Sequence, residues 1–161
     1  MKRLIVAVLV VTVIPLILST EEGDFMEVNA AINPRWLSRG QEGKVVLKLE
    51  LSDGVRINAH PSFIIECGLS EELIFPKNFF AASDLEIEVK EEDGKEFLNL
   101  KNPIEIPFTV SISAERGNHV FEGKIKYFVS SSDGEWCLKS TAKFSAPFYT
   151  RSSVVQKKRY P

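Results

Sequence analysis

Apolar and polar side chains alternate along much of the chain after residue 25. Between Val46 and Leu51 the leucines at odd positions share one face, and lysine and glutamate share the other. The longest alternating run spans residues 104–113, and its isoleucines, phenylalanine and valine are predicted to face the core. A period of two is typical of β-strands with one buried face. The predicted strands are 46–51, 55–57, 85–90, 97–98, 104–113, 120–129 and 143–148.

Turn-forming residues separate these predicted strands. Ser52–Gly54 and Glu92–Gly94 both end in glycine, and the second is expected to close a hairpin. Ser83–Asp84 is the one place where a helical turn is expected. Pro107 lacks an N–H, which predicts that its strand runs at a sheet edge. About eight short strands without an amphipathic helix predict an all-β fold, a two-sheet antiparallel sandwich.

The two ends of the chain differ from this pattern. Met1–Arg3 is basic, and fifteen uncharged residues follow. A basic start, an apolar core and a polar exit are typical of a secretory signal, whereas a spanning helix needs roughly 20 apolar residues. Because no Ala-x-Ala cleavage site is present, a retained N-terminal anchor stays open as the alternative.

We therefore expect a periplasmic or secreted protein whose chain has three regions. Residues 1–20 are predicted to be a signal peptide or an anchor, residues 25–149 the sandwich domain, and residues 150–161 a basic tail that is solvated at Lys157–Arg159. Membrane contact is expected only if the N-terminal segment is retained.

Composition and charge exclude several classes of function. The 161 residues include 20 basic and 22 acidic side chains, for a formal net charge of −2. This balance excludes a strongly basic nucleic-acid binder. Two cysteines and two histidines are too few for a four-cysteine zinc site or a histidine-based metal site. One of these histidines, His119, is expected to be exposed in a turn. We expect no metal, no cofactor and no serine-nucleophile enzyme.

The two cysteines carry the candidate chemistry. Cys67 follows an apolar run, and Cys137 follows a turn and lies beside Trp136. Outside the cytoplasm, two cysteines in one domain are most simply a disulfide. Two other interpretations stay open. The cysteines are either two buried, unreactive thiols or include a reactive thiol activated by a nearby positive charge, for which Lys126 and Lys139 are candidates.

Two segments resemble those of a known family. Residues 53–61, Asp-Gly-Val-Arg-Ile-Asn-Ala-His-Pro, resemble a segment of the N-terminal periplasmic domain of the thiol:disulfide interchange protein DsbD. Residues 121–137, with Tyr127 and a Gly-Glu-Trp-Cys ending, resemble that family's closing hairpin. The resemblance covers residues 28–148. It implies an immunoglobulin-like sandwich whose pair of hairpin cysteines passes electrons from a membrane-embedded partner to thioredoxin-like proteins.

The chain departs from this family at the implied dithiol site. Cys137 matches the second cysteine of the pair, but Ser130 stands where the first is expected. A serine cannot form a disulfide. Cys67 can replace the missing thiol only if the fold brings the two Cα atoms within about 7 Å.

Three more residues are binding candidates, and each has two interpretations. Tyr127 and Trp136 either flank Cys137 or pack as cross-strand partners. His60 either lines the cleft or holds a loop. Two functions follow. One is an extracytoplasmic domain related to thiol:disulfide interchange, degenerate in its dithiol site, that meets a thioredoxin-like protein or a DsbD-type membrane protein. The alternative is a non-catalytic sandwich module that binds a partner protein in the cell envelope.

Overall fold

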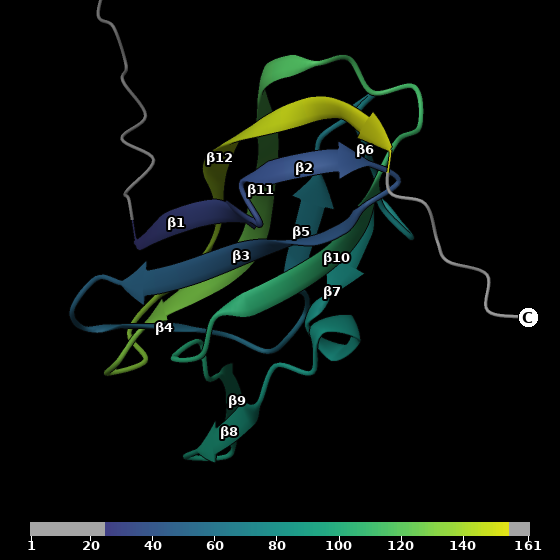
Figure 1. The fold of residues 1–161 in the computed structure, drawn as a ribbon. Coiled ribbons are helices and arrows are strands. Elements are labelled where there is room, and N and C mark those ends of the chain that lie inside the picture. The colour runs from purple at the N-terminus through teal and green to yellow at the C-terminus, as the bar shows by residue number, and fades with distance from the viewer. Residues whose placement is uncertain (1–24, 155–161) are drawn as a thin grey trace, which may run out of the picture.

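Two β-sheets pack face to face in the computed structural model, which describes residues 25–154 (Figure 1). One sheet has four strands in the order β1-β3-β10-β6. The other has the order β2-β12-β11-β5-β7, with β4 added beside β11, and β8 and β9 form a separate hairpin. The elements are β1 (Met26–Asn33), β2 (Trp36–Arg39), β3 (Glu42–Leu51), β4 (Val55–Ile57), β5 (Ile64–Cys67), β6 (Leu73–Ile74), β7 (Phe79–Ala81), the 3₁₀ turn η1 (Ala82–Leu85), β8 (Val89–Glu92), β9 (Lys95–Leu98), β10 (Ile104–Val110), β11 (Gly117–Ser131) and β12 (Cys137–Val154).

The strand order is that of an immunoglobulin-like domain. The sheet β1-β3-β10-β6 corresponds to the A-B-E-D sheet of such domains, and β12-β11-β5 corresponds to the G-F-C strands that face it. All pairings in these two sheets are antiparallel except one, in which β2 runs parallel to β12 with Trp36 opposite Tyr149. The prediction of an all-β, two-sheet, immunoglobulin-like sandwich is confirmed.

Alternation along the strands builds the core between the sheets. On β11, Ile125 and Tyr127 are buried and face the four-stranded sheet, and Lys126 between them points outward. Glycine is required where an aromatic ring lies against the backbone of a strand. A Cβ at Gly123 would collide with the ring of Phe144 on β12. The inner face of the six-stranded sheet is therefore filled, and its outer face is left for function.

The predicted strand 85–90 is wrong in its first half. A 3₁₀ turn covers Ala82–Leu85, and β8 begins only at Val89. Glu86 follows the turn with a left-handed φ of 52°, which interrupts the extended backbone that alternation alone had indicated. The helical turn expected at Ser83–Asp84 is confirmed.

Strand β10 ends three residues earlier than predicted. After Val110 the chain turns, because the N–H of Ala114 donates to the carbonyl of Ser111 at 3.1 Å. Ile112, which was expected in the core, is exposed for this reason. The sheet edge expected at Pro107 is present, since β6 pairs only with the last two residues of β10 and leaves its side open beside the proline.

The chain ends are partly described. Strand β12 continues to Val154, which pairs with Arg39 of β2, so the sheet extends into the segment predicted as a tail. The predicted signal or anchor at 1–20 and the basic run Lys157–Arg159 lie outside the described residues. Among residues 25–154, no helix is long and apolar enough to span a bilayer.

The β8–β9 hairpin projects from one end of the sandwich, at the bottom of Figure 1. Asp93 and Gly94 have positive φ angles of 53° and 73°, as a two-residue hairpin turn requires. This confirms the predicted hairpin. Arg56 of β4 holds it in place through an ion pair with Glu92 at 2.6 Å and a position 5.0 Å from the ring centre of Phe97.

Candidate functional site

The outer face of the six-stranded sheet carries most of the exposed candidate residues. Directly opposed residues of neighbouring strands point to the same face of a sheet. The register of β11 with β12 therefore places Ser130 beside Cys137 at one end of this face and Asn118 beside Tyr149 at the other. Three regions follow along it: the Cys137 end, a groove in the middle, and a cluster of aromatic and arginine side chains.

At the first end, Ser130 and Cys137 lie directly opposite each other, as predicted. Asn58 contacts both. Its Nδ2 donates to Cys137 Sγ at 3.3 Å, and the Ser130 hydroxyl donates to its Oδ1. Cys137 is an exposed free thiol. Asn58 was not among the predicted site residues, although it lies within the 53–61 segment that carries the family resemblance.

Cys67 does not lie near Cys137. Cys67 pairs with Gly123 and Cys137 with Ser130, and these partners are seven residues apart on β11, which is about 23 Å at 3.3 Å per residue. Cys67 faces the core, and burial raises the pKa of its thiol to about 12. The disulfide interpretation is therefore wrong. The chain has one buried and one exposed free thiol.

The other residues predicted at this end have mainly structural roles. Tyr127 is buried on the inner face, so it packs in the core and does not flank Cys137. Trp136 turns toward Phe25, with ring centres 5.4 Å apart. His60 lies 2.7 Å from Glu96 of β9 and holds the hairpin against the loop.

A groove of about 940 Å³ crosses the middle of the outer face. Glu66 of β5 accepts hydrogen bonds from Lys126 at 2.5 Å and pairs with Lys124 at 2.9 Å. These two lysines hold the pKa of Glu66 below its ordinary value. Leu69 and Phe79 line the groove and are 97% and 59% exposed. Lys126 is thus engaged with Glu66, 60 residues away in sequence.

The far end of the outer face holds what we call the arginine–aromatic patch, formed by Trp36, Tyr149, Arg116 and Arg151. The rings of Trp36 and Tyr149 are 4.5 Å apart. The guanidinium of Arg151 lies 5.6 Å from the ring centre of Trp36, and Arg116 Nε donates to the Tyr149 hydroxyl at 3.2 Å. That hydrogen bond raises the pKa of Arg116, which stays cationic. Two rings and two cations are thereby fixed in one place.

The patch remains accessible to a partner. Trp36 is 53% exposed, and Val120, which lies on the same face of the sheet two strands away on β11, is exposed as well. Within residues 25–154, neither Arg116 nor Arg151 forms an ion pair with a carboxylate. Sequence reasoning missed this patch, because its members come from β2, from β12 and from the loop that precedes β11. The sequence offered only a tryptophan next to Arg35, and the pairing of β2 with β12 is what brings Tyr149 next to it.

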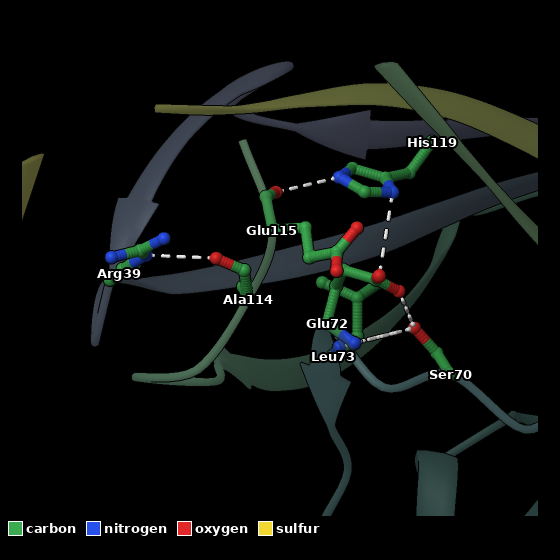
Figure 2. A network of polar contacts seen from close by, with 7 residues as sticks. All are labelled: Arg39, Ser70, Glu72, Leu73, Ala114, Glu115 and His119. Carbon is green, nitrogen blue, oxygen red and sulfur yellow. Dashed lines mark hydrogen bonds and ion pairs between the residues drawn. The ribbon is translucent and has the colours of Figure 1, made fainter. Parts of the chain in front are cut away.

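His119 lies in a separate polar network (Figure 2). Its Nε2 bonds the carbonyl of Glu115 at 2.8 Å, and its Nδ1 lies 3.5 Å from a carboxylate oxygen of Glu72. The Ser70 hydroxyl donates to the other oxygen of Glu72 at 3.2 Å. In a serine-nucleophile triad the histidine lies between the serine and the acid, whereas here the carboxylate lies between them. The arrangement of a catalytic triad is therefore not present here, and the network joins two loops.

The expectation that His119 is exposed was wrong. It belongs to β11, its side chain is 18% exposed, and it stacks on Phe148 with ring centres 5.2 Å apart. In the described part of the chain, no group of three or more histidine, cysteine, aspartate and glutamate side chains could hold a metal ion.

Comparisons with known proteins give structural likenesses alone. No family model matches the chain, and no curated protein matches it. The DsbD resemblance therefore stays a prediction. The chain resembles the major pilin subunit BcpA of Bacillus cereus at 12% identity and a TM-score of 0.43, covering 79% of this chain and 40% of the pilin.

Two further solved structures are similar at the same low level. An OlpA cohesin of Clostridium thermocellum is 14% identical with a TM-score of 0.39, covering 78% of this chain and 99% of the cohesin. Murine CRIg is 8% identical with a TM-score of 0.34, covering 79% of this chain and 98% of that protein. Likenesses this distant carry no argument about function, so the function must be argued from the chain's own surface.

Proposed function

We propose that this protein is a non-catalytic β-sandwich module that binds a partner protein outside the cytoplasm. Of the two functions predicted from the sequence, we choose the binding module and not thiol:disulfide interchange. A dithiol cycle needs two thiols in contact, and the residue opposite Cys137 is Ser130. The other cysteine, Cys67 of β5, faces the core, and its partner Gly123 lies seven residues from Ser130 along β11.

The observation that carries the proposal is the arginine–aromatic patch. Tryptophan, tyrosine and arginine are the residues most enriched where protein interfaces concentrate their binding energy. Here the rings of Trp36 and Tyr149 pack against each other at an interplanar angle of 39° on a rigid sheet, so little conformational entropy is lost when a partner covers them. The arginines beside them are free to meet carboxylates of that partner.

Location outside the cytoplasm is the second part of the proposal. It is supported by the basic start, apolar run and polar exit of residues 1–20, which are typical of an export signal. In that setting the exposed thiol of Cys137 is available for mixed disulfides, but its contacts with Asn58 and Ser130 give it no second redox group.

Hydroxyl-radical footprinting tests the binding proposal, because the chain has two tryptophans and one serves as the control. Trp36 is 53% exposed in the patch, and Trp136 is 38% exposed at the opposite end of the sheet. Both should oxidise in the purified protein. On intact cells we expect protection of Trp36 and unchanged oxidation of Trp136. Equal oxidation of Trp36 in cells and in the purified protein would overturn the proposal.

A further inference from the structure

We propose that the partner bound by the arginine–aromatic patch is a second copy of this chain, which docks through its acidic β8–β9 hairpin. This inference rests on the proposed function and names the occupant of the same surface. It follows from the charges at the two ends of the molecule and from the distance between them.

The hairpin is the acidic end. Residues 86–96 carry six carboxylates and two lysines, a net charge of −4. All four side chains of β8 are exposed, and the hairpin projects beyond the end of the sandwich in Figure 1. Glu91 lies directly opposite Glu96, and like charges in that position repel each other. A cation from outside the chain would relieve this repulsion.

Some hairpin charges are already used within the chain. Glu92 pairs with Arg56 at 2.6 Å, and Glu96 lies 2.7 Å from His60. These contacts fix the hairpin against β4. In the part of the chain that the structure describes, Glu91 takes part in no ion pair, and neither do Glu86 and Asp93, so Glu91 is the carboxylate within strand β8 that is left to meet a partner.

The patch is the complementary end. Arg116 and Arg151 offer two guanidinium groups without carboxylate partners among residues 25–154, next to two aromatic rings. Guanidinium groups bind carboxylates through paired hydrogen bonds. Val89, the exposed apolar residue of β8, adds a side chain that can cover part of the Trp36 ring.

The two ends lie too far apart to meet within one molecule. The hairpin is held to β4, which pairs with β11 from Val129 to Ser131, whereas the patch lies where Gly117 pairs with Thr150. Twelve residues of β11 separate Gly117 from Val129, which is about 40 Å at 3.3 Å per residue. The hairpin therefore reaches a patch only on another copy.

This arrangement gives a head-to-tail contact. Each copy presents one hairpin and one patch, and the two surfaces are different, so the contact is heterologous. Such contacts close into rings or extend into open chains of subunits, depending on the rotation between neighbours. Because the contact is between charged, exposed groups, it should weaken as salt screens it.

Sedimentation velocity tests this inference on the exported wild-type protein and on two variants, each with one charge reversed. Wild-type protein should form species larger than a monomer as concentration rises, and added salt should dissociate them. Glu91→Lys and Arg151→Glu should each remove the larger species. Both changes are on exposed side chains, and a circular dichroism spectrum like that of the wild type shows that each variant is folded.

Mixing the two variants is the decisive arm. The Arg151→Glu protein keeps its acidic hairpin, which can bind the unchanged arginine–aromatic patch of the Glu91→Lys protein. The Glu91→Lys protein carries a lysine on its hairpin, which can bind the glutamate in the patch of the Arg151→Glu protein. The larger species should therefore return in the mixture, while each variant alone stays monomeric. The doubly reversed chain should also assemble.

Two results would overturn the inference. One is a wild-type protein that stays monomeric at every concentration, and the other is assembly that neither reversal changes. If the protein is monomeric and Trp36 is nevertheless protected on cells, the proposed function stands and the partner is a different protein. If Trp36 is unprotected as well, both fail.

Discussion

Alkylation of the native protein should distinguish the two cysteines by a large factor. Burial raises the pKa of the Cys67 thiol from 9.0 to about 12. The thiolate is the reactive form, so at pH 8 the reactive fraction falls from about one in ten to about one in ten thousand. We therefore expect native Cys67 to react about 1,000-fold more slowly than Cys67 of the unfolded chain. The exposed Cys137 should react rapidly in both states.

The assay is iodoacetamide labelling in buffer and in denaturant, followed by mass spectrometry of the two cysteine-containing peptides. Cys137 is the internal reference within each sample. Labelling of native Cys67 at a rate within tenfold of the unfolded chain would refute the buried position of this thiol. Failure of both cysteines to react until a reductant is added would mean that they form a disulfide, which would refute the strand register itself.

Three further predictions follow from the strands of the outer face. Ser130→Cys should form a strained, easily reduced disulfide with Cys137, because opposed residues have Cβ atoms about 4.5–5.5 Å apart, close to but above the roughly 3.5–4.5 Å that a disulfide prefers; mass spectrometry that finds free thiols at both positions 130 and 137 after mild oxidation would contradict it. Gly68→Ala should lower the free energy of unfolding by about 1–3 kcal/mol, because its Cβ would collide with the carbonyl oxygen of Glu122; an unchanged urea midpoint would refute this. The pKa of Glu66 is lowered below 4.5 in the folded state, so its stabilising contribution is present above that pH and is lost as the pH falls through the folded pKa. Glu66→Gln should therefore reduce the loss of unfolding free energy at acidic pH, and an unchanged pH dependence of stability would count against the pairing with the lysines.

The fold was predictable because alternation and turn residues are local signals. The run from Val46 to Leu51 and the hairpin at Asp93–Gly94 could be placed from a few neighbouring residues each. The errors arose where a long-range contact or a turn competes with alternation. Ile112 continues the apolar period of β10 but lies in a turn, and the pattern alone gives no sign of it.

The candidate surface was less predictable, because it depends on strand pairing. The opposition of Ser130 and Cys137 follows from one hairpin and was predicted correctly. The approach of Trp36 to Tyr149 requires the parallel pairing of β2 with β12, between segments more than one hundred residues apart. No local pattern encodes that pairing, so the residues that support the proposed function could be assembled only from the structure.

Site-specific photo-crosslinking in the exporting host tests the central claim most directly, namely that the arginine–aromatic patch is the surface that binds a protein. A photoreactive residue at Val120 lies on the outer face beside the patch, and one at Leu138, also exposed, lies near the opposite end of β12 as the control. We predict a discrete protein cross-link from position 120 that is lost when Trp36→Ala is added, and none from position 138. Equal cross-linking from both positions, or none from position 120, would contradict the account.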